Sequence, residues 1–552
     1  MYDKLNTFEK VVFDVMSLTL VLFYSYSAVL EPAATQYHRG IYVIITYVLV
    51  FLLYKSKFWV FRIVDYLLIV ASIVTVGYWM VNFEAINYRT GAETQLDQWM
   101  AMVGVLIGIE LARRVVGNVF VIIGVAMILY GMYGAYMPDL ISHAGDTFPL
   151  LCTSIFYKSD GVFGIMANVL ATYVILFVLF GAYLEKCGAQ KFFIDFPLAA
   201  VGHKVGGPAK VAVIASGLFG SISGSAIANT VSTGTFTIPM MKRAGFKPHI
   251  AGAIEPAASI GGMFMPPIMG AGGFIMAELT GVPYSRIMLV AVFPAIMYFF
   301  SVFVMVHYEA KLHNVIGEKS EHSAWQILKS EWYYILPLVI ITILMLTGYS
   351  PGYSAILGMV TCIFISWFSK ETRIDLTMGL VVLSFVVFKF LSVKMGMHIK
   401  WYFLTIPGII AAIGMWYRHK GKNKTYLTAF LEGARSGTES SLKIGATVGV
   451  IGIIIGVLTF SGLVLTFADI VIELAAGKLW LTILLIACAS LVLGMGVPVT
   501  AAYLITAVVA VPALTHLGVN EIAAHMIVYW LSQDSNITPP VCIAAFAGAT
   551  IA

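Results

Sequence analysis

The chain repeats itself inside its apolar segments, and this repeat limits the folds it can adopt. In both copies Gly, Ser and Pro interrupt an apolar stretch. Broken helices leave backbone groups that lipid cannot satisfy, so paired breaks are typical of the binding site of a secondary transporter. An offset of 273 residues relates the following pairs without a gap: Pro239 and Pro512, Gly245 and Gly518, Ala251 and Ala524, Ser259 and Ser532, Pro266-Pro267 and Pro539-Pro540.

Composition indicates a membrane protein. The chain is 60% hydrophobic and 11% charged, whereas a soluble protein carries roughly 25% charged residues. Because a spanning helix needs about 20 apolar residues, we predict an all-α polytopic membrane protein with about 15 or more membrane segments, some of them re-entrant. The first segment, near Val11, is predicted to be a retained helix and not a signal peptide. The net charge of +5 lies mainly in loops, which favours membrane lipid as surroundings and argues against a nucleic-acid partner.

Lysine and arginine placement predicts the orientation. Basic residues cluster in alternate loops, whereas loops 82–98 and 138–161 are richer in acids. The positive-inside rule therefore places the basic loops and the N-terminus in the cytoplasm. The basic clusters are Lys55, Lys57 and Arg62; Arg113 and Arg114; Lys186 and Lys191; Lys370 and Arg373; and Arg418, Lys420, Lys422 and Lys424.

The chain divides into two regions. Residues 1–137 hold a compact group of spans without a repeat, and residues 138–552 contain the duplication. Within the second region we expect repeat one at about 162–310, connecting spans at about 330–440 and repeat two at about 442–552.

Two details of this division are further expectations. The basic, amphipathic stretch 418–437 is predicted to lie as a helix at the cytoplasmic interface. Repeat two stops without a counterpart of the span 287–306, which suggests that the chain is truncated or that a longer natural protein is partly represented.

The first break is rich in small polar residues. Glycine allows the chain to turn, and serine hydroxyls either cap helix ends or coordinate a hard cation. A re-entrant hairpin tip here would expose helix N-termini to anions and carbonyls to cations. Close packing of small residues is the alternative interpretation. The candidate binding residues are Ser221, Ser223, Gly224, Ser225, Asn229 and Thr230, with a possible sodium site at Ser223, Gly224 and Ser225.

The second hairpin and two unwound stretches complete the predicted site. Glycine and proline break the second hairpin, and the Pro-Pro doublets mark interruptions in the spanning helices that face the tips. We expect the two tips to stop short of crossing the membrane and to face opposite sides. The further candidates are Gly494, Gly496, Pro498 and Thr500 at the tip, and Gly261, Gly262, Pro266, Asp534, Asn536 and Thr538 in the unwound stretches.

Two acids lie inside apolar segments. An intramembrane carboxylate is costly, and its default interpretation is functional. Glu255 is therefore the candidate for proton coupling, and Asp534 is the second choice. The alternative for Glu255 is a protonated carboxyl that binds a backbone carbonyl. His249 and His525 lie nearby, but neither belongs to a cluster with ligand spacing, so we expect helix-end or packing roles.

At these residues the chain resembles a known family. The stretch 218–241, LFGSISGSAIANTVSTGTFTIPMM, resembles the membrane component of tripartite ATP-independent periplasmic (TRAP) transporters. The stretches 252–279 and 530–548, containing MFMPPIMGAGGF and SQDSNITPPVCIAAFAGA, are more similar to its TAXI branch. In that branch the small and large membrane subunits are commonly fused, as residues 1–137 and 138–552 would be here.

The resemblance implies an elevator transporter of a bacterial or archaeal inner membrane. A mobile domain built from the two repeats would carry a small organic anion, typically a carboxylate, past a scaffold. A soluble periplasmic substrate-binding protein would deliver it. Sodium-coupled relatives have an acid beside the second hairpin break, which residues 494–500 lack, whereas TAXI-type helices carry one where Glu255 stands. The coupling ion is therefore a proton or sodium, and no other cofactor is expected.

Other function classes fit less well. The chain has no HExxH, no GxSxG and no clustered Cys/His set, which argues against an enzyme. It has no GxxxxGK[ST] motor motif. The five cysteines are far apart and predict neither a disulfide framework nor a metal site. An ion channel and an ion-coupled transporter that works without a binding protein remain the alternatives.

Overall fold

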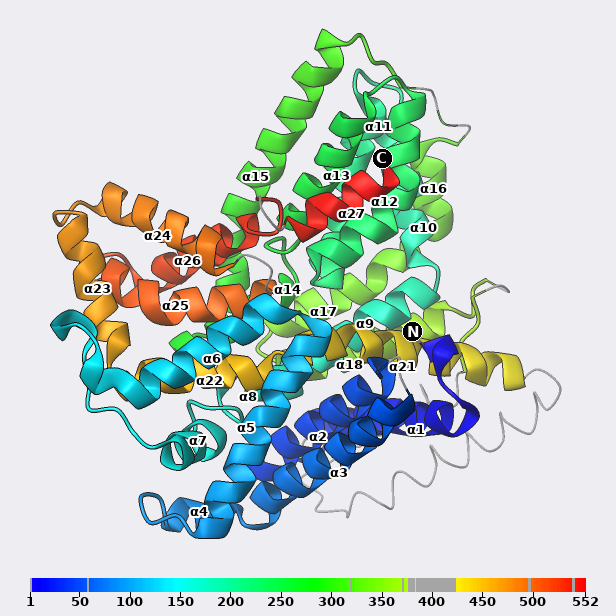
Figure 1. Cartoon of the computed structure of the whole chain (residues 1–552). Helices are drawn as coiled ribbons and strands as arrows, with labels where there is room; N and C mark the ends of the chain where they lie inside the picture. Colours follow the sequence, from blue (N-terminus) through cyan, green and yellow to red (C-terminus); the bar gives the residue numbers. More distant parts are fainter. Residues whose placement is uncertain are drawn as a thin grey trace.

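A computed structural model describes residues 2–56, 59–317, 320, 322–369, 372–375, 383, 423–494, 498–538 and 542–552. Within these ranges every regular element is a helix, and nine helices are long and apolar enough to cross a membrane (Figure 1). The prediction of an all-α polytopic membrane protein is therefore confirmed. Gly496, Pro539-Pro540 and, within the expected connecting spans at about 330–440, residues 376–382 and 384–422 lie outside the described residues.

The N-terminal helices form a group at one end of the molecule (Figure 1). Capping boxes start two of them: the Asn6 side chain accepts from the Glu9 amide before α1, and Thr94 does the same for Asp97 before α5. Helix α2 is buried along most of its length between its neighbours. The helices are α1 (Thr7–Val29), α2 (Thr35–Leu53), α3 (Trp59–Val81), α4 (Phe83–Tyr88), α5 (Gln95–Val115) and α6 (Asn118–Tyr133), with short 3₁₀ turns at Tyr2–Lys4, Gly134–Tyr136 and Asp139–Ile141.

A second set of helices packs against this group. The amphipathic helix α21 begins at Asn423 and ends at Gly445. Its Phe430 lies on the Tyr183 ring of α9, and its Arg435 binds Asp14 of α1. The set comprises α7 (Phe148–Tyr157), α8 (Ile165–Val169), a π-helical turn (Leu170–Val174), α9 (Ile175–Lys186), α10 (Ala189–Val201), α16 (Ala324–Glu331), a 3₁₀ turn (Trp332–Ile335), α17 (Leu336–Leu346), α18 (Pro351–Ile365), α21 and α22 (Val448–Ser461).

The sequence repeat coincides with a repeat of helices. The offset of 273 residues carries the first residues of three helices, Ala226, Pro248 and Gly270, onto those of their counterparts, Val499, Glu521 and Ile543. Equivalent sequence therefore starts equivalent helices. The pairs are α11 (Gly207–Ser223) and α24 (Leu479–Leu493), α12 (Ala226–Arg243) and α25 (Val499–His516), α13 (Pro248–Gly262) and α26 (Glu521–Asp534), and α14 (Gly270–Thr280) and α27 (Ile543–Ile551). Helix α15 (Tyr284–Leu312) follows the first set, and α23 (Leu463–Leu474) precedes the second.

The two repeats exchange their last helices. Helix α27 packs against α12 and α13 of repeat one, and α14 packs against α25 and α26 of repeat two. In Figure 1 the red α27 lies among the green helices for this reason. Inside repeat one, α11 and α13 cross closely: a Cβ on Gly262 would lie 2.5 Å from the Gly220 Cα. The last turn of α13 thus packs directly on the last turns of α11.

A hydrogen-bonded bridge joins the repeats to the other helices. Arg39 of α2 donates to the Asn168 side chain on α8 at 3.2 Å and to the Phe163 carbonyl at 2.7 Å. Asn168 in turn donates to Glu278 on α14 at 2.8 Å. The bridge therefore links the N-terminal group, α8 and repeat one.

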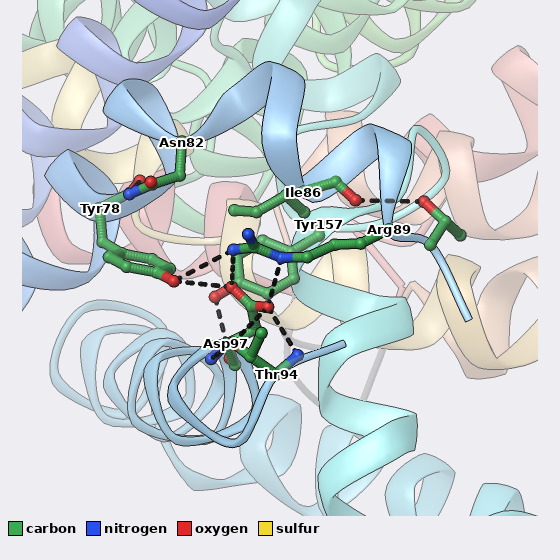
Figure 2. A network of polar contacts seen from close by, with 8 residues as sticks. Tyr78, Asn82, Ile86, Arg89, Thr94, Asp97 and Tyr157 are labelled. Carbon is green, nitrogen blue, oxygen red and sulfur yellow. Dashed lines mark hydrogen bonds and ion pairs between the residues drawn. The ribbon is translucent and has the colours of Figure 1, made fainter. Parts of the chain in front are cut away.

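One ion pair fixes the connection between α3, α5 and α7 (Figure 2). Asp97, in the first turn of α5, is fully buried and accepts from Arg89 at 2.7 and 2.6 Å and from Tyr78 at 2.7 Å. Tyr157 of α7 donates to the Asp97 carbonyl at 2.9 Å. Burial alone would raise the pKa of Asp97, but hydrogen bonds from Arg89, Thr94 and Tyr78 outweigh it and lower the pKa to about 2.

We predict that Asp97→Asn destabilises the detergent-solubilised protein by about 1–3 kcal/mol, because buried donors lose their charged acceptor. The carboxylate's contribution is complete above its usual pKa of about 3.9 and is lost as the pH falls toward about 2. The difference in melting temperature should therefore be constant from about pH 5 to 8 and shrink below about pH 4. A difference that grows toward low pH would contradict the assignment.

Candidate functional site

A cavity of about 400 Å³ lies where both repeats meet the other helices. At the first tip α11 ends at Ser223, Gly224 turns the chain with a φ of 61°, and α12 starts at Ala226. A side chain at Gly224 would be strained at that φ, which explains the glycine. The repeat residues that line the cavity include Ser223–Ile227, Met263, Ile268, Gly270, Pro498–Thr500, Asn536 and Ile543.

Four helices begin at this cavity. Ala226, Gly270, Val499 and Ile543 are the first residues of α12, α14, α25 and α27, and all four line it. The first amides of a helix have no partner within the helix and carry partial positive charge. Their convergence supplies amide donors to the cavity and suits this part of it to an anion.

One buried hydroxyl at the cavity has no partner among the described residues. Thr500, in the first turn of α25, is 3% exposed, and its Oγ1 forms no hydrogen bond within the described residues. Such an orphan is costly unless a ligand completes it. The Ser225 hydroxyl, in contrast, accepts from the Ala228 amide at 3.3 Å and caps α12.

Six of the predicted site residues line the cavity, and others lie outside its lining. Ser223, Gly224, Ser225, Pro498, Thr500 and Asn536 line it. Ser221 donates to the Leu218 carbonyl, Thr538 donates to the Asp534 carbonyl, and Gly261 and Gly262 allow close packing. The residues outside the lining are Ser221, Asn229, Thr230, Gly261, Gly262, Pro266, Gly494, Asp534 and Thr538.

Glu255 lies behind the first tip in a box of hydroxyl groups. It is fully buried, and Ser216 of α11 with Thr233 and Thr237 of α12 donate to its carboxylate. Gly234 leaves room for it, since a Cβ there would lie 3.2 Å from the Glu255 Cγ. Glu255 itself does not line the cavity.

Asn229 connects this box to the hairpin. The side-chain amide of Asn229 donates to the Ser216 backbone carbonyl at 2.9 Å. The backbone carbonyl of Asn229 accepts from the Thr233 hydroxyl at 2.7 Å. The side-chain Oδ1 of Asn229 and the hydroxyl of Thr230 are buried without a hydrogen bond in the described part of the chain. Two residues of the box thus contact both Glu255 and Asn229.

Repeat two has no equivalent box. The offset carries Glu255 to Val528, Ser216 to Ala489 and Thr237 to Ala510. Only Thr233 keeps its type, as Thr506, whose hydroxyl has no partner among the described residues. Asp534 lies elsewhere, near the end of α26, and is half-buried.

The two histidines have structural surroundings. His249 is exposed in the first turn of α13. His525 is buried and lies 2.9 Å from the Tyr503 hydroxyl.

Sequence reasoning missed the tyrosines that hold the first unwound stretch. Tyr529 of α26 donates to the carbonyls of Met263 and Met269, at 2.9 and 2.6 Å. Tyr284 of α15 donates to the Pro267 carbonyl at 3.0 Å. No local signal marks these residues. The box could have been found, because Asn229, Thr233 and Thr237 recur every four residues on one helix face.

Comparison with known proteins gives a family. Residues 103–552 match the family model described as "Tripartite ATP-independent periplasmic transporter, DctM component". A putative TRAP transporter large permease protein of Haemophilus influenzae is 28% identical over 168 residues, 30% of this chain and 39% of that protein. The C4-dicarboxylate TRAP transporter large permease protein DctM of Rhodobacter capsulatus is 29% identical over 217 residues, 37% of this chain and 49% of that protein.

A further relative is named for another anion. The sialic acid TRAP transporter large permease protein SiaM of Vibrio cholerae is 24% identical over 216 residues, 39% of this chain and 50% of that protein. The chain thus spans between two fifths and half the length of these curated relatives.

We predict that Tyr529→Phe lowers stability by about 1–3 kcal/mol, because two buried carbonyls lose their shared donor while the ring stays. The effect should be measured as the shift in thermal unfolding in detergent. Tyr503→Phe is the matched control: it removes a hydroxyl of the same repeat that contacts His525 and not the unwound stretch. Equal shifts in both variants would show that Tyr529 has no special part in holding the break.

Proposed function

Because the chain belongs to the family of the DctM component of tripartite ATP-independent periplasmic transporters, we propose that it is a secondary active transporter importing a small organic anion. The substrate class is a carboxylate, such as a dicarboxylate or an amino acid. A periplasmic substrate-binding protein delivers the anion, and proton or sodium symport drives uptake. The convergence of four helix N-termini and the orphan Thr500 hydroxyl at one cavity carries the proposal.

The four helix N-termini at the cavity support an anionic substrate. Helix N-termini favour carboxylates, and the partly apolar wall formed by residues such as Val174 and Phe177 leaves room for a small carbon skeleton. Relatives named for C4-dicarboxylate, sialic acid and 2,3-diketo-L-gulonate transport are all named for organic acids. These names support an organic acid as the substrate class, and they do not identify which acid is transported.

The elevator mechanism is part of the proposal. The repeats exchange α14 and α27, which favours their movement as one body. The cavity lies between that body and α5, α9 and α21, so sliding along these helices would carry the site across. We further propose an inner-membrane location, a cytoplasmic N-terminus and, for residues 1–137, the fused small subunit of the TAXI branch.

The hydroxyl box favours a proton as the coupling ion. A charged Glu255 accepts hydrogen bonds from Ser216, Thr233 and Thr237. When Glu255 is protonated, Thr233 and Thr237 can instead donate to carbonyls that they already reach, those of Asn229 at 2.7 Å and Thr233 at 3.1 Å. Both protonation states are thus satisfied. Sodium held at Ser223, Gly224 and Ser225 is the alternative.

The test is uptake by proteoliposomes with the binding protein supplied, under sodium and proton gradients imposed separately. We expect accumulation of a carboxylate that requires the binding protein and one gradient. Full uptake without the binding protein would favour the simpler ion-coupled transporter. Flux that only dissipates gradients, without accumulation, would favour a channel.

We predict that Glu255→Gln abolishes proton-driven accumulation while substrate exchange is partly kept, because the side chain keeps its shape and loses its proton. Thr506→Val is the matched control, since it removes the equivalent hydroxyl in the repeat without a box. Accumulation and its pH dependence are compared in the same vesicles. Unchanged accumulation in Glu255→Gln would leave Glu255 a packing acid, and Asp534 would be tested next.

A further inference from the structure

Part of the wall of the cavity comes from helices outside the paired helices α11–α14 and α24–α27. Helix α21 contributes Ser440, Lys443 and Ile444, which share one helix face. Tyr54 and Val115, at the ends of α2 and α5, continue this wall. One side of the cavity therefore belongs to the transporting repeats, and the other belongs to the scaffold.

Lys443 is the one charged side chain among the described residues that line the cavity. Its side chain is exposed to the cavity, and it forms no ion pair within the described ranges. Glu439 lies one turn earlier on α21 but does not line the cavity. Because no acidic side chain is among the described residues that line the cavity, an anion that enters would be the first charged partner of this ammonium within the cavity.

We infer that Lys443 is a scaffold-side cation that binds a carboxylate of the substrate while the tips face α21. This inference rests on the proposed function and adds a specificity-determining residue to it. One carboxylate oxygen would meet the helix ends and the Thr500 hydroxyl, and the ammonium would meet another from the opposite wall. A neutral analogue would gain nothing from the lysine.

The lysine's position makes its effect depend on the conformational state. Thr500 and Ser225 travel with the repeats, whereas Lys443 belongs to α21, which packs on α9 and α1. When the repeats slide, the substrate moves with them and away from Lys443. Tyr54 and Val115 precede the basic loops that the positive-inside rule places in the cytoplasm, so Lys443 acts on the cytoplasm-facing state.

The test measures anion binding to the purified protein in detergent, by calorimetry and thermal shift. The probes are a C4-dicarboxylate, sialic acid and 2,3-diketo-L-gulonate. For whichever anion the wild type binds, Lys443→Gln should weaken binding about tenfold or more, as expected for a lost charged hydrogen bond. Lys443→Arg should keep most of the affinity. Lys186→Gln, a cation paired with Glu432 outside the cavity, is the matched control.

A cross-link tests the dependence on state. Cysteines at positions 168 and 278, whose side chains now share the Asn168–Glu278 hydrogen bond, can be joined by a short bis-maleimide in a background without the native cysteines. In the joined protein Lys443→Gln should show the full loss of anion affinity.

The outcomes separate the two proposals. If the wild type binds a probe and Lys443→Gln binds it equally well, the lysine has no role in binding. The proposed transport function then still stands. A loss equal in Lys443→Arg and Lys443→Gln also overturns it, because charge would then not matter. No binding of any probe by the wild type removes the support for both. A loss that disappears in the cross-linked protein overturns the assignment to this state.

Discussion

Every backbone amide and carbonyl inside a bilayer must find a partner within the protein, and this constraint governs the structure. The chain breaks helices at the tips and in the unwound stretches, which releases polar groups at the centre. Some of these polar groups find a partner in the other repeat. The Tyr529 hydroxyl of repeat two donates to carbonyls of the stretch 263–269 in repeat one. The first residues of α12, α14, α25 and α27 instead line a cavity. The groups left open are thus gathered where a ligand can complete them.

The two repeats have equivalent helices, but they differ in the side chains at equivalent positions. Both begin their equivalent helices at equivalent residues, so the duplication preserves where the breaks fall. The hydroxyl box exists in repeat one alone, since Val528 replaces Glu255. A carboxylate enclosed by hydroxyl groups therefore lies behind the first hairpin, and its equivalent position in repeat two is apolar. Repeat two keeps the orphan hydroxyl of Thr500 at the cavity, so ion coupling and substrate contact can be divided between the halves.

Much of this arrangement could be predicted from the sequence, because it depends on local signals. The offset gave the breaks, and Gly224, Pro498 and the Pro-Pro doublets mark chain that cannot continue a helix. Tyr529 and Lys443 required the structure, because each acts through residues distant in sequence. Lys443 in particular stands in an amphipathic helix, where a lysine is typical of a solvated face. Only the fold shows that this face closes the cavity.

The link between the box and the tip explains how a proton could affect a substrate that Glu255 does not touch. Ser216 and Thr233 bind both Glu255 and Asn229, and Asn229 lies one turn from the capping Ser225. When Glu255 is charged, these hydroxyls turn toward it. When it is protonated, the Thr233 hydroxyl can donate to the Asn229 carbonyl alone, which strengthens the link between Asn229 and the next turn of α12. Asn229 directly follows the residues of α12 that line the cavity, so the protonation state of a buried acid can bias the geometry of the cavity wall through this helix.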